Sequence, residues 1–252
     1  MNIVDPMKRT MSADFWVLGL AVSALVIGSG CKKRISATSD DVKSSAEGKA
    51  CPAAEGMISD GESNSNQVNP IKGRGGYWYT FVDSNGSTIT PTAGSQGGTF
   101  AMAPGGANGS KYAAHMSGQI GTADTVYAGM GLNFVDPKGT YDATAYKGVS
   151  FWAKKGPGSN AKVRLKMPDT NTDPEGKVCK ECFNDFGMDL MLTEEWTQYV
   201  VPYLAMSQLK GWGSPHTPGV DSSKVYGLQF QVNDKGVPYD VWVDDIEFTG
   251  CP

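Results

Sequence analysis

An aspartate stands on the apolar face of the last strand that the sequence predicts. Residues 239–248 (YDVWVDDIEF) alternate in polarity, and one face of this strand is expected to carry Trp242, Ile246 and Phe248. Asp244 falls on the same face. A carboxylate there must be paired, ligate a metal ion or sit in water at the end of the sheet, because an unpaired buried charge is costly. Asp244 is therefore the first candidate functional residue.

Polar side chains that can hydrogen-bond to a ligand are predicted on the outward face of two other strands. They are Arg164 and Lys166 in 162–168, and Gln229 and Gln231 in 225–232. Sugars are held by such groups on their hydroxyls and by aromatic rings on their C–H faces. The aromatic side chains and the histidine that we expect to border them are Tyr77, Trp78, Trp212 and His115. Each residue also has an alternative role. Arg164 and Lys166 would form a solvated face, Trp212 would anchor a loop, and His115 would be a structural histidine.

The sequence gives little support for catalysis or for nucleic-acid binding. It contains no nucleophile elbow, no zincin helix and no Cys–His pair, and Asp244 and Asp245 are neighbours predicted on opposite faces. The formal charge is −4, with two histidines and no basic stripe. We therefore expect a protein that is not an enzyme and that has no nucleic-acid partner.

The first thirty residues are predicted to be a targeting segment. Lys8 and Arg9 precede the apolar stretch 15–27, which is short for a membrane span, and small residues lead to Cys31. The pattern resembles a bacterial lipoprotein signal, although Gly28 stands where leucine is usual. We expect lipidation at Cys31, a flexible polar tether over 31–55, and an exported protein anchored in the cell envelope or outer surface. An ordinary cleaved signal peptide is the alternative.

The cysteine count fits an oxidising compartment. If Cys31 is lipidated, four cysteines remain, and these allow three pairings. We favour Cys51–Cys251, because both lie just outside the first and last predicted strands, which often end side by side in a sandwich. Cys179–Cys182 then closes a local loop. Half of a zinc site is the alternative for this pair, but the sequence offers no second half.

Many short apolar runs separated by turn residues predict an all-β fold for residues 56–252. Runs 225–232 and 239–248, joined by Asn-Asp-Lys-Gly, are expected to form a long hairpin. The spacing favours an antiparallel two-sheet β-sandwich as a single domain. The expected strands cover 57–60, 77–83, 99–103, 112–117, 128–134, 147–154, 162–168, 186–193, 196–202, 225–232 and 239–248.

Five motifs in order resemble the galactose-binding-like jelly rolls, most closely the family 11 carbohydrate-binding modules. They are GVSFWAK, VRLKMP, EEWTQYVVPYLAMSQLKGWG, VYGLQFQV and WVDDIEF. The resemblance implies a concave sheet that holds a glucan chain. It also implies a structural calcium, at positions that match Asp60, Glu62 and Asp244. The insertion 169–185, which carries Cys179 and Cys182, departs from the family pattern and is expected to reshape or cover the binding face.

The function that these observations favour is non-catalytic binding of a polysaccharide, such as a β-glucan, by an exported, membrane-tethered monomer. One alternative is a structural or adhesive envelope lipoprotein that binds protein partners through the same fold. A small glycan-active enzyme is the other. An exposed row of aromatic side chains on the concave face would favour the sugar-binding function.

Overall fold

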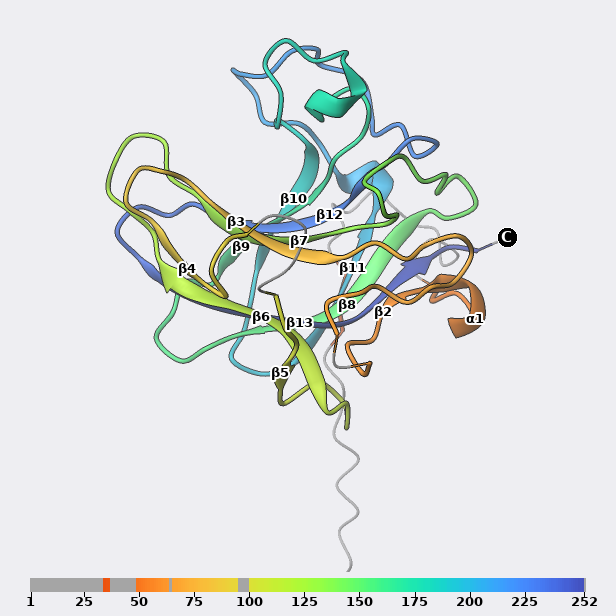
Figure 1. Ribbon diagram of the computed structural model, residues 1–252, viewed down its shortest axis with the longest axis horizontal. Helices are drawn as coiled ribbons and strands as arrows, with labels where there is room; N and C mark the ends of the chain where they lie inside the picture. Colours follow the sequence, from red (N-terminus) through yellow and green to blue (C-terminus); the bar gives the residue numbers. More distant parts are fainter. Residues whose placement is uncertain (1–33, 37–48, 64, 95–99, 252) are drawn as a thin grey trace, which may run out of the picture. The chain divides into compact units, whose positions relative to one another are not determined.

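Two β-sheets packed face to face make up most of the part of the chain that the computed structural model describes, which is residues 34–36, 49–63, 65–94 and 100–251 (Figure 1). The larger sheet has the strand order β1-β11-β8-β13-β6-β4, with β2 beside β13 and β5 beside β6. Its strands are β1 (Arg34–Ser36), β2 (Met57–Ser59), β4 (Thr88–Thr90), β5 (Ala103–Pro104), β6 (Tyr112–Gln119), β8 (Gly148–Lys155), β11 (Thr197–Pro202) and β13 (Pro238–Thr249).

The smaller sheet has five strands in the order β10-β9-β12-β7-β3, and all its neighbours are antiparallel. The larger sheet is antiparallel apart from β1, which runs parallel to β11. The predicted two-sheet β-sandwich is therefore confirmed. The five strands are β3 (Trp78–Val82), β7 (Ala128–Asn133), β9 (Lys162–Met167), β10 (Phe186–Met191) and β12 (Gly227–Val232), and the short helices are α1 (Ala53–Gly56), η2 (Pro174–Gly176) and η3 (Tyr203–Ala205).

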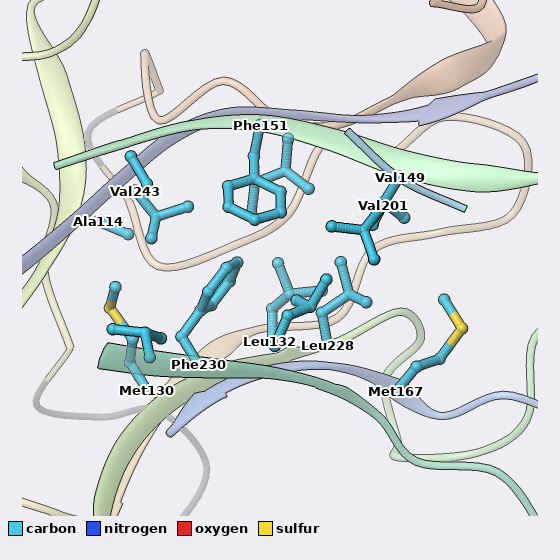
Figure 2. Close-up of a cluster of buried hydrophobic side chains, with 14 of the residues drawn as sticks. Ala114, Met130, Leu132, Val149, Phe151, Met167, Val201, Leu228, Phe230 and Val243 are labelled. Carbon is cyan, nitrogen blue, oxygen red and sulfur yellow. The ribbon is translucent and has the colours of Figure 1, made fainter. Parts of the chain in front are cut away.

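The core lies between the two sheets and is built by the inward half of each alternating strand. Phe151 of β8 meets Phe230 of β12 edge to face, with ring centroids 5.1 Å apart. This interleaving of apolar side chains is the main source of stability for such a sandwich. Figure 2 shows Ala114, Val149, Phe151, Val201 and Val243 pointing from the larger sheet toward Met130, Leu132, Met167, Leu228 and Phe230 of the smaller one.

The last two strands do not form the predicted hairpin. β12 pairs with β7 and β9 in the smaller sheet, whereas β13 pairs with β6 and β8 in the larger one. The connecting segment bonds to the β6–β7 connection instead, since Gly236 N donates to Gly121 O (3.0 Å) and Val237 O accepts from Ile120 N (3.1 Å). A turn is present in the predicted segment, but it carries the chain from one sheet to the other.

A β-bulge in β13 changes the position predicted for Asp244. The register with β8 shifts between Asp244 and Glu247, and Asp245 adopts a positive φ of 47°. Before the bulge Val241 and Val243 are the buried side chains, so Trp242 points outward and does not share the face of Ile246. Asp244 is also on the outward side, and its burial comes from a covering loop rather than from the core.

Two disulfides are present, as predicted. Cys51–Cys251 joins the segment before α1 to the end of β13, with Cα atoms 5.5 Å apart. Cys179–Cys182 closes a short loop, with Cα atoms 5.1 Å apart.

The structured part of the chain begins before the predicted boundary at residue 56. Lys49 O accepts from Gly250 N (2.8 Å), Cys51 N donates to Phe248 O (3.2 Å), and α1 follows directly. This stretch and β1 both lie within the predicted tether 31–55. Among the residues described, no helix is long and apolar enough to cross a membrane; the predicted targeting segment and Cys31 lie outside them.

Candidate functional site

A groove with a volume of about 1330 Å³ runs over the outer face of the five-stranded sheet. The strand register sets the order of side chains across its floor. One row runs from Tyr79 through Gly131 and Gln229 to Lys166. The next row runs from Phe81 through Gly129 and Gln231 to Arg164. Aromatic side chains therefore lie at one side of the sheet and polar side chains at its middle.

The aromatic side of the groove is a strip of rings along β3. Tyr79 and Phe81 have centroids 6.2 Å apart, and Phe81 lies 6.2 Å from Tyr127. Their position depends on two glycines in β7. A Cβ at Gly131 would lie 2.9 Å from the hydroxyl of Tyr79, and a Cβ at Gly129 would come still closer to the ring of Phe81. Both rings therefore lie over bare backbone, and their planes are tilted by 43° to each other.

The polar middle of the floor is held in place by internal hydrogen bonds. Gln229 Nε2 donates to the hydroxyl of Tyr79 (3.0 Å), which connects the aromatic strip to the amide row. Lys166 is 6% exposed, and its Nζ donates to Gln231 Oε1 and to Phe183 O, both at 3.1 Å. Lys166 thereby fixes the amide of Gln231, and amides held in this way can bind hydroxyls without a large loss of side-chain entropy.

Every cationic side chain that lines the groove, among the residues described, lies beside a carboxylate. Lys166 Nζ is 2.9 Å from Asp185 Oδ2 in a pair that is almost fully buried. The groove therefore offers paired charges rather than a field of one sign. The other pairs are Arg164–Asp189 at 2.9 Å, Lys138–Asp173 at 2.7 Å and Lys235–Asp124 at 3.0 Å.

Most of the predicted sugar-binding residues lie together in this groove, and two do not. Trp78 is only 1% exposed; its ring stacks on Phe100 in the core, and its indole N–H donates to Ser59. His115 lies on the outer face of the other sheet, stacked on Trp242 at 3.9 Å. Those two assignments are corrected. The residues that do line the groove are Tyr77, Arg164, Lys166, Trp212, Gln229 and Gln231.

Sequence reasoning missed several side chains that the groove contains. The run from Tyr77 to Phe81 has aromatic residues in both phases of the alternation, so the pattern did not show which phase faces outward. The paired glycines of β7 were the available signal, because alternating glycine marks close approach over a strand. The residues missed include Tyr79, Phe81, Tyr127, Phe183 and Asp185.

The three carboxylates predicted to bind calcium are each bound to protein groups. Asp60 accepts from Asn69 Nδ2 (3.0 Å) and from the amide of Glu62 (3.1 Å). Glu62 Oε1 accepts from the amides of residues 111 and 112, at 2.8 and 3.0 Å. Within the described part of the chain, no group of three or more His, Cys, Asp or Glu is arranged to hold a metal ion. These three residues stay a prediction as calcium ligands.

Asp244 is nevertheless unusual among these carboxylates. It is 3% exposed beneath the loop that contains Gly106 and Ala107, and its Oδ2 accepts from Ala107 N at 2.7 Å. Burial raises the pKa of Asp244 to about 7, and the nearby charges of Asp245 and Glu62 act in the same direction. Binding of a cation or of a proton would neutralise the buried negative charge of Asp244.

Comparison with known proteins identifies the class to which this sandwich belongs. The family 11 carbohydrate-binding module of the cellulosomal cellulase Lic26A-Cel5E of Clostridium thermocellum is similar over 79% of this chain and 97% of its own, at 14% identity and a TM-score of 0.54. The family 11 module from Clostridium thermocellum solved with a β-1,3-1,4-mixed-linked tetrasaccharide covers 78% and 97%, at 16% identity and a TM-score of 0.51. These similarities establish the fold of a carbohydrate-binding jelly roll.

The family itself is shown by sequence. The family described as carbohydrate binding domain 30 matches residues 93–250, which is more than half of the chain. The protein therefore belongs to this family of carbohydrate-binding modules. No curated protein matches the chain.

Proposed function

We propose that this protein binds a neutral polysaccharide, such as a β-glucan, non-catalytically along the groove of the five-stranded sheet. The observation that carries the proposal is the combination of an aromatic strip and a fixed row of amide groups on one face. Aromatic rings stack on the C–H faces of sugar rings, and side-chain amides both donate to and accept from hydroxyls. The strip on β3 and the row on β12 lie in register across β7, whose glycines leave the floor between them without side chains.

The charge pairs support a neutral rather than an acidic glycan. An acidic polysaccharide would be recognised by cations that are free to pair with it. In this groove Lys166 is committed to Asp185, Lys138 to Asp173, and Arg164 to Asp189. Breaking such a pair to bind a uronic acid or sulfate would leave a carboxylate uncompensated, which is costly where the pair is buried.

The same pairs support a binding role without catalysis. Glycoside hydrolysis by the common mechanisms needs two carboxyl groups, one of them protonated as an acid. Asp173 and Asp185 in the groove are instead each engaged by a lysine, at 2.7 and 2.9 Å. Their role in this proposal is to fix the lysines that shape the floor.

Removing the ring of Tyr79 is expected to weaken binding of mixed-linkage β-glucan about fivefold to tenfold, because a stacked aromatic contact contributes about 1 to 1.4 kcal/mol. Tyr79→Phe should retain most of the affinity, since it keeps the ring and loses only the hydroxyl bonded to Gln229. Isothermal titration and affinity electrophoresis measure the change. The mixed-linked glucan is the first probe because the similar family 11 module was solved with it.

His115→Ala is the matched control, because His115 lies on the opposite sheet. The proposal fails if a folded wild-type protein binds no neutral glucan. It also fails if Tyr79→Ala binds as well as the wild type.

We also propose that the protein is exported and tethered to the cell envelope through a lipid on Cys31. The support is the basic, apolar and small-residue order of positions 1–31 together with two disulfides in the folded part. Cys31→Ser is expected to move the protein from the membrane fraction into the soluble exported fraction. Mass spectrometry of the wild-type N-terminal peptide checks the lipid directly, and an unacylated Cys31 would contradict the proposal.

A further inference from the structure

Two long loops, 168–185 and 203–226, meet beside the smaller sheet and form one wall of the groove (Figure 1). Asn184, which is 2% exposed, joins them: its Oδ1 accepts from Leu209 N at 2.8 Å, and its Nδ2 donates to Trp212 O at 2.6 Å. Glu181 adds a backbone bridge to Ser214. The wall is therefore a cross-connected unit, although it consists of loops.

Two aromatic side chains on this wall are exposed. Phe183 is 58% exposed and Trp212 is 44% exposed, and both line the groove. The backbone of Phe183 has a positive φ of 73°, which is uncommon for a bulky residue. Its N donates to Thr172 O (2.8 Å) and its carbonyl accepts from Lys166 (3.1 Å), so the surrounding structure holds this conformation. Strain of this kind concentrates at ligand-binding sites.

The loop disulfide ends one residue before Phe183. Cys179 and Cys182 close a ring of the insertion, and Cys182 itself lines the groove. The cross-link limits the conformations of the segment that presents Phe183. It therefore provides part of the preorganisation that a loop would otherwise lack.

A buried carboxylate oxygen lies at the base of the same wall. Asp185 is 2% exposed and lines the groove, and its Oδ2 is 2.9 Å from Lys166 Nζ. Its Oδ1 has no hydrogen-bond partner among the described residues. A buried acceptor in this state calls for a donor from a ligand or from water, since leaving it unsatisfied is costly.

We propose that this wall is a second sugar-binding subsite, supplied by the insertion and separate from the aromatic strip on β3. Phe183 and Trp212 take the C–H face of a neutral sugar ring, and Asp185 Oδ1 accepts a hydrogen from one of its hydroxyls. The inference rests on the proposed function and deepens it. The glycan chain would then be held between two aromatic surfaces, one on the sheet and one on the loops.

The test replaces Phe183 by glycine in the full-length protein and measures affinity for mixed-linkage β-glucan oligosaccharides. Glycine adopts a positive φ without strain, so the melting temperature should stay the same or rise. Affinity should nevertheless fall about tenfold, because a stacking ring is lost. Phe183→Tyr should restore the affinity. A purely structural role for Phe183 predicts unchanged affinity in the glycine variant.

Two further variants complete the test. Leu204→Ala is the matched control, since Leu204 is 80% exposed and is not among the groove residues, and its affinity should be unchanged. The double variant Cys179→Ser, Cys182→Ser should bind more weakly than the wild type but more tightly than Phe183→Gly, because the cross-link supplies only part of the order of the loop. If Tyr79→Ala weakens binding and Phe183→Gly does not, this inference is overturned and the proposed function stands. If the wild type binds no glucan, both are overturned.

Discussion

Replacing Cys51 and Cys251 together by alanine is expected to lower the free energy of unfolding by about 5 kcal/mol. The bridge closes a loop with a sequence separation of 200 residues, and the chain-entropy account gives about 5 kcal/mol for a loop of that length. Losses of this size equal much of the stability of an ordinary domain. Guanidinium denaturation of the oxidised wild type and of the variant measures the difference.

The second disulfide is the internal comparison for that result. Cys179 and Cys182 are separated by three positions, and the same account gives only about 2 kcal/mol for so short a loop. The double alanine variant at these positions should therefore unfold at a denaturant concentration much closer to that of the wild type. Equal losses from the two bridges would contradict the argument from loop length.

In the absence of a bound metal ion, the stability of the protein is expected to depend strongly on pH through Asp244. Its pKa is raised from the ordinary 3.8 to about 7 in the folded protein. The contribution of Asp244 is therefore fully present below about pH 4 and is lost as the pH rises through 7. The loss is on the order of 4 kcal/mol as an upper limit, from about 1.4 kcal/mol for each pKa unit.

Asp244→Asn isolates this effect. With a chelator present, raising the pH from 4.5 to 8 should lower the unfolding free energy of the wild type relative to that of the variant. Added calcium, which binds only the folded form in our prediction, should recover the wild type at pH 8 and leave the variant unchanged. If calcium does not change the melting curve of the wild type, Asp244 does not bind calcium, and only its protonation affects stability.

Asp245→Asn is the matched control for this experiment. Asparagine tolerates the positive φ found at Asp245, so the bulge should be retained. The calcium response should be retained as well, because the buried carboxylate of Asp244 is intact.

Much of the fold could be predicted because alternation and turn residues act locally. The observed bounds of strands such as β8 and β9 lie within a residue of the predicted ones. The predicted pairing of β12 with β13 was wrong, because a turn reverses the direction of the chain without fixing which strand becomes the partner. Which strand becomes the partner is decided by how the two sheets pack.

The candidate site was predicted in part for a related reason. Regular alternation in two strands correctly predicted the outward side chains that line the groove, which are Arg164, Lys166, Gln229 and Gln231. At Trp78 the aromatic residues occupy both phases, so periodicity alone could not separate the core from the surface. In β13 one extra residue at the bulge reversed the phase after Asp244, and nothing in a run such as VDDIEF marks a bulge clearly.

The last two strands also determine how this domain can fold. β12 is the middle strand of the smaller sheet, and β13 lies inside the larger one between β8 and β6. Until residues 227–249 are present, each sheet is divided into separated pieces, and the core between them cannot close. Contacts of such long sequence range make folding slow and cooperative. A chain of this topology is therefore expected to complete its fold only after its last two strands have been made.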